Sequence, residues 1–439
     1  MSSGSLNILV FGVPLVILVV TYIARQKLKA RKALRKLDEA KSSGLTEPAT
    51  LHPLIDPSVC LGCGTCVTAC PEGEILGLIN RKAVLISPSS CIGHGACKEA
   101  CPTDAISLVF GTATRGVEIP QLTPEFETTV PGIFIAGELG GMGLIKNAIT
   151  QGVQAVASIQ RFLRKTNSNS SGDLLDLIIV GAGPAGIAAA LEAKQSKLNF
   201  RVFEQDSIGG TISHYPRGKI VMTQPAELPI VGKFQFKEAS KETLMEFWLS
   251  AAAHVKQQIT TQTRVQRIEQ VGNHFVIGAG DQNIQSRTVL LALGRRGTPR
   301  KLGVKGEELS KVIYRLAEPE HFRSRQVLVV GGGDTALEAA LAISEQPGAK
   351  VTLSYRSPVF SRAKVKNRDR IEQAAKAGHV NLLLNSQVSE ITEEFVVVST
   401  EAGSHSMPND DVIVCAGGVL ATPFLKEIGI HVEEKFGSV

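Results

Sequence analysis

The stretch "DLIIVGAGPAGIAAALEAKQSKLNFRVFEQD" occupies residues 176–206 and decides the fold. An apolar run leads into three glycines with the spacing Gly181-x-Gly183-x-x-Gly186, an alanine-rich run follows, and a second apolar run ends at Glu204. In a strand–turn–helix–strand unit, such glycines allow a tight turn, the close approach of a pyrophosphate and close packing of helix on strand, while the acid binds ribose hydroxyls. The glycines occur here together with both strands, the helix and the acid, so the stretch predicts a dinucleotide-binding fold.

A second segment of the same design is "RQVLVVGGGDTALEAALAISEQPGAKVTLSYRS", residues 325–357. Its fingerprint is Gly331-x-Gly333-x-x-Ala336, and its second apolar run ends at Arg356, without an acid. A cation at this place suits the 2′-phosphate of NADPH, so the segment favours NADPH and leaves NADH as the alternative. Two more basic residues follow, Arg362 and Lys364. A plain surface charge pattern is the other explanation of these cations.

Two such units in one chain resemble the two-dinucleotide-fold flavoproteins of the thioredoxin reductase and pyridine-nucleotide disulfide oxidoreductase kind, over residues 173–439. Three further segments carry the resemblance: "SIGGTISHYP" (207–216), "ALGRRGTP" (292–299) and "VIVCAGGVLATP" (412–423). The resemblance implies that FAD binds the first fold, where Gly210 and Thr211 would contact it, and that NAD(P)H binds the second. It also implies three parts: an FAD-binding domain at 173–297, an NAD(P)-binding domain at 298–415 and a return to the FAD domain at 416–439.

The redox-active C-x-x-C of that family is missing from both places where the family carries it. Before the second fingerprint the chain has "YRLAEPEHFRSR" (314–325), and after the first it has "SIGGTISH", neither with a cysteine. The sequence therefore predicts no dithiol relay and argues against disulfide reductase activity.

The segment that ends the chain in that family is found upstream here, as "FETTVPGIFIAGELGGMGLIKNAITQGVQAVASIQRFLRK" (126–165). By resemblance, Gly137 and Glu138 would contact the flavin, with Glu138 where the family usually has Asp. We therefore predict a circular permutation, in which residues 111–165 complete the FAD domain, 166–172 form a linker and Val439 lies near residue 111. An unrelated strand–helix connection is the alternative.

Seven of the eight cysteines fall within residues 60–101, in two runs of nearly the same design. The runs read Cys60-x2-Cys63-x2-Cys66-x3-Cys70-Pro and Cys91-x2-His94-x2-Cys97-x3-Cys101-Pro. The spacing C-x2-C-x2-C-x3-C-P is typical of bacterial ferredoxins, in which the fourth cysteine binds the other cluster. A zinc site is the alternative. This region, residues 54–110, resembles a dicluster ferredoxin domain.

The resemblance implies two ligand sets. One [4Fe–4S] cluster would be held by Cys60, Cys63, Cys66 and Cys101. Cys70, Cys91 and Cys97 would supply three ligands of a second cluster, with His94 at the fourth position. His94 could bind iron and raise the potential, the second cluster could be [3Fe–4S], or it could be absent. Either of the first two makes the clusters unequal and gives electron flow a preferred direction.

The N-terminal segment "LNILVFGVPLVILVVTYIA" (Leu6–Ala24) holds 19 residues without a charge. At about 1.5 Å per residue it nearly spans a hydrocarbon core of about 30 Å. We predict a transmembrane anchor over residues 1–24; a cleavable signal peptide and a buried core helix are the alternatives.

A basic run follows, "RQKLKARKALRKLDEAK" (25–41), with eight Lys or Arg and two Asp or Glu. It accounts for the whole formal charge of +6, so the rest of the chain is neutral and nucleic-acid binding is disfavoured. By the positive-inside rule, residues 25–53 become a juxtamembrane helix and linker of a single-pass protein of the cell inner membrane with a cytoplasmic body.

The sequence thus predicts an α/β protein with two Rossmann-like domains, a small α+β ferredoxin domain and a transmembrane helix. The function that uses every part is a membrane-anchored oxidoreductase that passes electrons between NAD(P)H, FAD, the clusters and a redox protein or quinone-linked partner. A flavoenzyme that reduces a small organic substrate and an iron–sulfur redox sensor are the alternatives. No protein acid or base is required; His214 is a proton donor or a loop residue, Cys415 is core filler, and a homodimer is possible.

Overall fold

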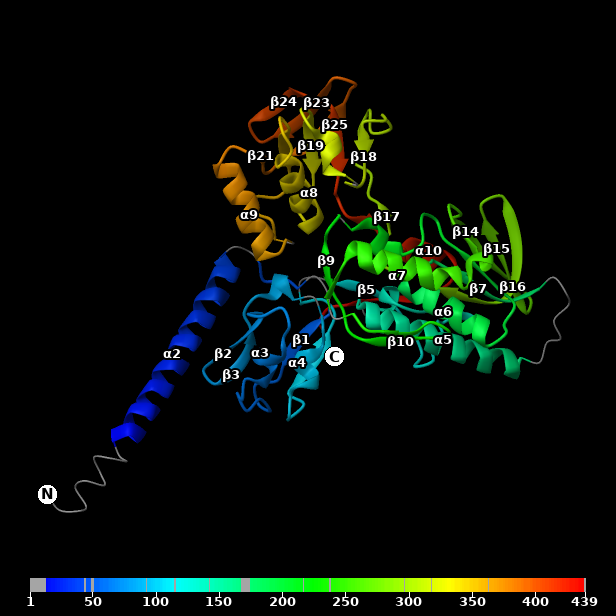
Figure 1. Cartoon of the computed structure of the whole chain (residues 1–439), viewed down its shortest axis with the longest axis horizontal. Coiled ribbons are helices and arrows are strands. Elements are labelled where there is room, and N and C mark those ends of the chain that lie inside the picture. Colours follow the sequence, from blue (N-terminus) through cyan, green and yellow to red (C-terminus); the bar gives the residue numbers. More distant parts are fainter. Residues whose placement is uncertain are drawn as a thin grey trace, which may run out of the picture. The chain divides into compact units, whose positions relative to one another are not determined.

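The computed structural model describes residues 13–437 apart from 43–44, 49–50, 92, 114–115, 142, 167–173, 216, 237, 296, 317 and 362. The chain divides into two compact units (Figure 1). The first holds residues 1–116 with 436–439, and the second holds residues 117–435.

The first unit is made of short elements that surround the cysteine loops. Its elements are α2 (Val13–Ser42), β1 (His52–Ile55), α3 (Thr65–Ala69), β2 (Leu76–Ile79), β3 (Lys82–Leu85), α4 (Ala96–Glu99) and β4 (Ile106–Val109). β1 pairs antiparallel with β4, and β2 with β3. α3 and α4 each begin after a glycine with positive φ, Gly64 and Gly95, so the two cysteine runs fold alike. Cys60, Cys66 and Cys97 are buried in the core of this unit.

The prediction of a transmembrane helix is wrong. Within the described residues, no helix is long and apolar enough to cross a membrane; residues 6–12 of the predicted span lie outside them. The uncharged part of α2 runs from Val13 to Ala24, about 18 Å at about 1.5 Å per residue, against a core of about 30 Å. The helix then continues unbroken through the basic run. The inner-membrane location and the membrane partner stay predictions.

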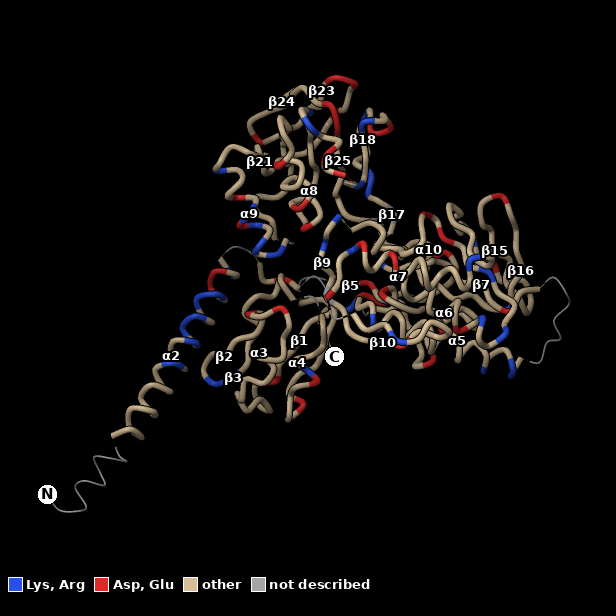
Figure 2. Tube along the Cα trace, in the orientation of Figure 1, with Lys and Arg blue, Asp and Glu red and all other residues tan. Residues whose placement is uncertain are grey.

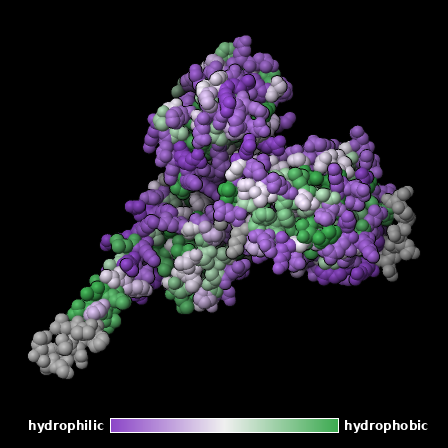
Figure 3. All heavy atoms as spheres, viewed as in Figure 1, coloured by the Kyte–Doolittle hydropathy of each residue, from purple (hydrophilic) through white to green (hydrophobic). Residues whose placement is uncertain are grey.

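The basic half of α2 packs on the rest of the first unit. Ala33 is buried, and a Cβ added at Gly77 of β2 would lie 2.8 Å from the Cβ of Ala33. Lys36 Nζ lies 2.6 Å from Glu74 Oε2, and Lys32 binds the same carboxylate. These two hydrogen bonds lower the pKa of Glu74 to about 2. The other cations lie in the same later part of the helix (Figure 2). The described start of the helix exposes apolar side chains (Figure 3).

The larger sheet of the second unit has the strand order β13-β8-β7-β16-β15-β14, with β6 also paired to β16. The strands are β6 (Ile133–Ile135), β7 (Leu175–Val180), β8 (Phe200–Phe203), β13 (Ile259–Thr260), β14 (Val265–Val271), β15 (His274–Ala279) and β16 (Gln282–Leu291). Its helices are α5 (Ile145–Lys165), α6 (Pro184–Gln195) and α7 (Lys241–Ala253). β7, β8, β13, β16 and β6 pair in parallel, as a dinucleotide fold requires. The apolar run before Gly181 is therefore a buried central strand.

Part of the segment 111–165, which precedes the first fingerprint in the sequence, belongs to this sheet. β6 pairs with residues 289–291 of β16, which also pair with β7. α5 lies against α6, and a Cβ added at Gly152 of α5 would lie 2.3 Å from the carbonyl oxygen of Ala185 of α6. This is the strand and helix placement that the predicted permutation requires.

A second, five-stranded parallel sheet has the order β18-β25-β19-β20-β21. Its strands are β18 (Val312–Ile313), β19 (Gln326–Val330), β20 (Lys350–Ser354), β21 (Val380–Leu383) and β25 (Asp411–Val414). With it are α8 (Asp334–Ser344), α9 (Val365–Lys376) and a three-stranded antiparallel sheet of β22 (Gln387–Ile391), β23 (Phe395–Thr400) and β24 (Gly403–Pro408). The second fingerprint lies between β19 and α8, as its sequence indicated.

Short pairs complete the second unit. They are β9 (Ile220–Met222) with β12 (Glu238–Ser240), β10 (Ala226–Leu228) with β11 (Gly232–Phe234), β17 (Thr298–Pro299) with β26 (Gly418–Val419), and β5 (Val117–Pro120) with β27 (Val432–Lys435), and α10 (Thr422–Glu427) precedes β27. β17 and β26 join the two crossings between the dinucleotide folds. In the first unit, Gly437 N donates to Phe110 O at 2.7 Å. Val439, predicted to lie near residue 111, is outside the described residues.

Candidate functional site

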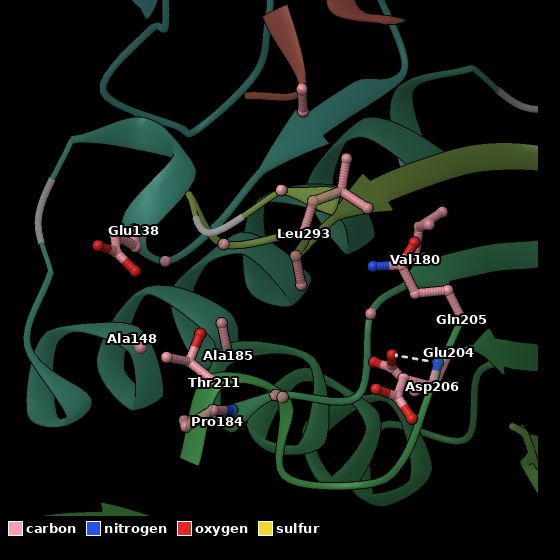
Figure 4. Close-up of a pocket in the computed structure, with 18 of the residues that line it drawn as sticks. Glu138, Ala148, Val180, Pro184, Ala185, Glu204, Gln205, Asp206, Thr211 and Leu293 are labelled. Atoms are coloured by element: carbon pink, nitrogen blue, oxygen red, sulfur yellow. Dashed lines mark hydrogen bonds between the residues drawn. The ribbon is translucent and has the colours of Figure 1, made fainter. Parts of the chain in front are cut away.

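A cavity of about 340 Å³ opens at the carboxyl ends of β6, β7 and β16 in the second unit. Seven predicted flavin-site residues line it: Gly137, Glu138, Gly181, Gly183, Glu204, Gly210 and Thr211. Figure 4 shows Glu138 on one side of the cavity and Glu204 with Asp206 on the other. The wall is therefore built from the front segment of the chain as well as from the first fingerprint.

Close backbone contact explains the glycines of the first fingerprint. Gly181 has φ of +109°, and a Cβ there would lie 2.5 Å from the carbonyl oxygen of Ala292 at the end of β16. Gly186 does not line the cavity; a Cβ there would lie 1.8 Å from the carbonyl oxygen of Gly181. Gly183 faces the cavity, and a Cβ there would meet only Gly210, at 3.8 Å. The space in front of the N-terminus of α6 is thus kept open for a phosphate.

Glu204 holds this loop in shape. Its carboxylate accepts hydrogen bonds from the backbone N–H of Ala182 at 2.7 Å and of Asp206 at 2.9 Å. The side chain is buried, and these two donors satisfy its carboxylate oxygens. The predicted role of Glu204 toward ribose stays a prediction, and its contacts add a second role in fixing the glycine loop.

Glu138 lies where the chain turns from β6 toward α5. Burial raises the pKa of Glu138, while the charge and backbone N–H of Arg295 act in the opposite direction. Burial also lowers the pKa of Arg295, against the charges of Glu138 and Glu118. Gly137 N donates to Gln151 Oε1 at 2.8 Å, which ties the turn to α5.

Three charged or polar side chains meet at the cavity rim, and only one of them stood out in the sequence. His214 Nε2 lies 3.2 Å from Asp206 Oδ2, and His214 Nδ1 contacts an Arg315 nitrogen. Arg315 also lies 4.0 Å from Asp206. His214 is thus a hydrogen-bonded residue between two partners. The position of Asp206, two residues after Glu204 at the strand end, is the signal that could have identified it.

The glycines of the second fingerprint also make close backbone contacts or leave open space. Gly331 has φ of +144°, and a Cβ there would lie 2.4 Å from the carbonyl oxygen of Cys415. A Cβ at Gly333 would meet nothing within 4 Å, so this position is open toward a ligand. Ala336 is buried in the first turn of α8, and Arg356 is exposed just beyond β20. Arg362 lies outside the described residues.

Asp334, at the start of α8, fixes the loop in which the basic residues lie. Its Oδ1 accepts from Lys364 N and from Asn367 Nδ2, both at 2.8 Å. Asn367 Nδ2 also donates to Glu338 Oε1 at 3.1 Å, and Lys219 Nζ lies 3.1 Å from the other oxygen of that carboxylate. Lys219 belongs to the FAD side, so a polar chain links the two dinucleotide folds.

In the first unit, one small cavity of about 10 Å³ is lined by the four cysteines of the first predicted set: Cys60, Cys63, Cys66 and Cys101. Burial, with the charges of Cys60, Cys63 and Cys97, raises the pKa of Cys66 to about 11. Gly62 also lines this cavity, has φ of +70° and would clash with Arg81 O if it carried a Cβ. Four converging sulfurs on tightly wrapped backbone fit an iron–sulfur cluster.

The second predicted set is also gathered in one place. Burial raises the pKa of Cys91 and of Cys97, and the charge of Cys70 contributes in the same direction to both. His94 Nε2 lies 3.3 Å from Glu72 Oε1, a residue that the sequence did not single out. Among the described residues, no three His, Cys, Asp or Glu side chains could hold a metal ion. A single metal ion needs its ligands closer together than a cluster of several irons does.

Comparison with known proteins decides the family. Residues 178–438 match the family described as pyridine nucleotide-disulphide oxidoreductase. The chain belongs to this family. Residues 52–102 match a 4Fe-4S dicluster domain. The resemblance that the sequence motifs indicated is confirmed for both parts.

Relatives of this pyridine nucleotide-disulphide oxidoreductase include a ferredoxin–NADP reductase of Ignicoccus hospitalis. It is 30% identical over 270 residues, which cover 59% of this chain and 83% of the relative. A thioredoxin reductase of Listeria monocytogenes is 31% identical over 281 residues, 61% of this chain and 81% of the relative. The bacillithiol disulfide reductase Bdr of Staphylococcus aureus shares the fold, with a TM-score of 0.51 and 23% identity over 59% of this chain and 81% of that one.

This pyridine nucleotide-disulphide oxidoreductase is therefore an FAD- and NAD(P)-dependent enzyme with an iron–sulfur domain, as the sequence predicted. The residues around the larger cavity fit FAD, because an open glycine loop, a helix N-terminus and a buried acid converge there. The assignment of individual residues to FAD, NADPH and iron, including both ligand sets, stays a prediction.

Proposed function

We propose that this chain transfers electrons between NADPH, FAD and iron–sulfur clusters, and exchanges them with a redox protein. The observation that carries the proposal is the joint presence, in one chain, of a dinucleotide cavity and a cavity lined by four cysteines. A nicotinamide delivers two electrons as a hydride and an iron–sulfur centre moves one, and FAD supplies the conversion between them.

The chain's own residues bind and orient the groups. Glu204 fixes the loop that would bind the FAD pyrophosphate, and Glu138 lies where the segment from the front of the chain closes the cavity. Arg356 would bind the 2′-phosphate of NADPH, in a loop that Asp334 holds in place. Gly333 leaves room for the nucleotide backbone.

Three observations favour a redox protein over a disulfide as the partner. Outside residues 60–101 the sequence has one cysteine, Cys415, so no C-x-x-C accompanies either fingerprint. Among the described residues that line the larger cavity there is no cysteine. One relative is named a ferredoxin–NADP reductase, which pairs this fold with an iron–sulfur partner. In this chain the corresponding module is covalently joined.

An anaerobic titration of the full-length protein with NADPH, and separately with NADH, tests the proposal. The flavin absorbance should bleach first, and an EPR signal of reduced clusters should grow as more NADPH is added. NADH should require a higher concentration for the same effect. The variant Cys60→Ser is the matched control, because its flavin should still bleach while the first cluster signal is lost. A wild-type flavin that bleaches with no cluster signal at any NADPH concentration contradicts the proposal.

A further inference from the structure

His94 and Glu72 form a pair between the two cysteine runs. Glu72 follows Cys70 by two residues in the first run, and His94 stands at the position of the missing cysteine in the second. His94 Nε2 lies 3.3 Å from Glu72 Oε1. The side chains are 12% and 22% exposed, so the pair is largely withdrawn from water.

Glu72 also lies among the predicted ligands of the second cluster. Its charge contributes to the raised pKa of Cys70 and of Cys91, after the larger effect of burial. The carboxylate of Glu72 therefore lies near three members of the predicted ligand set: Cys70, Cys91 and His94. A half-buried carboxylate there is costly unless a donor compensates it, and the imidazole N–H is such a donor.

Histidines that bind metals usually donate their other ring N–H to a carboxylate or carbonyl, which fixes the ring orientation and raises the basicity of the ligand. The His94–Glu72 contact has this form. Glu72 engages Nε2, and Nδ1 is the other nitrogen of the ring.

We propose that Glu72 is a positioning residue for the second cluster, accepting a hydrogen bond from His94 Nε2 so that Nδ1 binds the fourth iron. The inference rests on the proposed function in one respect: the second ligand set must hold a cluster. It assigns the fourth iron to imidazole, which excludes the [3Fe–4S] and empty alternatives at this site.

The surroundings of the first ligand set differ in kind. Cys63 Sγ lies 3.2 Å from the hydroxyl of Thr65, and Cys101 Sγ lies 3.7 Å from that of Thr103. Hydroxyls near sulfur act as donors and favour the reduced cluster, whereas a carboxylate behind the imidazole opposes reduction. Glu72 therefore moderates the rise in potential that replacing a thiolate by histidine causes.

The test uses full-length protein reduced with dithionite, so that it does not depend on nicotinamide or flavin. Pulsed EPR detects the coupling of a ¹⁴N nucleus bound directly to iron, and an EPR-monitored redox titration gives the potential of each cluster. The variants are Glu72→Gln, Glu72→Ala and His94→Cys. Glu99→Gln is the matched control, because Glu99 is an exposed acid on α4, two residues from Cys97.

In the wild type we expect ¹⁴N coupling on one cluster only, and His94→Cys should abolish it while keeping two clusters. Glu72→Gln should keep the coupling and shift the oxidised-to-reduced ratio of that cluster about tenfold toward reduction, about 59 mV for one electron. Glu72→Ala should weaken or remove the coupling. Glu99→Gln should shift the ratio less than about twofold, and the first cluster should be unchanged in every variant.

Two results overturn the proposal. One is the absence of ¹⁴N coupling in the wild type, whether a [3Fe–4S] signal or no second cluster is found. The other is a coupling and a potential that both Glu72 variants leave unchanged. If Glu72→Ala does not fold, its iron content will be low, and the test then depends on the ¹⁴N coupling and the potential of Glu72→Gln. Failure of NADPH to reduce the first cluster would contradict the proposed function and leave this result untouched.

Discussion

In the first dinucleotide fold, a Cβ at Gly186 would lie 1.8 Å from the carbonyl oxygen of Gly181. At the equivalent position of the second fold stands Ala336, whose Cβ is accommodated in the buried first turn of α8. Gly331, the partner of Ala336, lies close to it, since a Cβ added there would be 3.1 Å from the Cβ of Ala336. The first fold thus brings its helix against the loop at a distance that only glycine permits, and the second does not.

The two folds also differ in the residues that follow the second strand of the fingerprint, β8 in the first fold and β20 in the second. In the first fold, Glu204 is buried and accepts two backbone hydrogen bonds. In the second, Arg356 is exposed and Gly333 opens onto free space. The first site is also lined by residues of the segment from β6 to α5, namely Ala136, Gly137, Glu138, Gly143, Leu144, Ile145 and Ala148. A closed, internally bonded site suits a resident cofactor, and an open, basic one suits a nucleotide that enters and leaves at each turnover.

The largest expected effect tests the tight loop of the first fold. Gly186→Ala should lower the free energy of unfolding by about 3 kcal/mol or more, because the new methyl group meets backbone that cannot move aside. FAD should be lost from the purified protein, as measured by its absorbance together with thermal unfolding. The matched change, Ala336→Gly, should cost only about 1 kcal/mol and leave FAD bound. A Gly186→Ala protein with normal FAD content would show that the two loops are equivalent.

A smaller loss is expected at the start of α8, where the second fold has an acid. Asp334→Ala removes the acceptor of two hydrogen bonds of 2.8 Å and should lower the free energy of unfolding by about 2 kcal/mol. The loop with Arg356 should loosen, and the KM for NADPH should rise several-fold with kcat little changed. Urea unfolding and steady-state kinetics with an artificial acceptor measure both. Asp369→Ala, an exposed acid of α9, is the control; equal effects of the two variants would refute the role of Asp334.

Nucleotide choice should depend on Arg356. Arg356→Ala should raise the KM for NADPH about tenfold, equivalent to about 1.4 kcal/mol, and leave the KM for NADH unchanged. The exposed Arg323, which precedes the amino end of β19 while the fingerprint follows its carboxyl end, serves as the control in Arg323→Ala. Parallel changes for NADPH and NADH would mean that Arg356 does not bind a 2′-phosphate.

The smallest effect concerns the acid that closes the first site. Burial raises the pKa of Glu138 above its ordinary value of 4.5, so ionisation is less favourable in the folded than in the unfolded protein. The penalty is absent well below pH 4.5, grows as the pH rises through the raised pKa and is then constant. Glu138→Gln should therefore be more stable than the wild type by about 0.5–1 kcal/mol at pH 8, and equal at pH 4.

Thermal unfolding of the FAD-containing protein between pH 4 and pH 8 measures this difference. Glu125→Gln, at an exposed acid, should show no pH-dependent gain. A wild type that is more stable than Glu138→Gln at pH 8 would show that interactions of the carboxylate outweigh its burial.

The sequence predicted the parts of the molecule that local pattern determines. The strand–glycine–helix order around Gly181 and Gly331 determines the local backbone conformation, so both fingerprints form the expected turns. The cysteine spacing likewise placed the first ligand set around one cavity. Side-chain partners between distant segments had no such signal. Nothing in the sequence pairs Glu72 with His94 or Arg315 with His214, because those contacts depend on how loops fold back.

The wrong prediction of a transmembrane helix also has a physical cause. The predicted span was taken from hydropathy alone, as the uncharged run from Leu6 to Ala24, and no cap or breaker separates it from the basic run. The helix continues through the basic run, and buried alanines such as Ala33 pack it on β2. A helix end must be read from its capping residues as well as from hydropathy.

Rapid mixing of the anaerobic full-length protein with NADPH, followed by freeze-quench EPR, tests the central claim most directly. The account predicts that the cluster signal appears after the flavin bleaches, at a rate that does not change when the protein is diluted tenfold, because the electron moves within one chain. A cluster signal that never appears, or one whose rate falls in proportion to protein concentration, would contradict it.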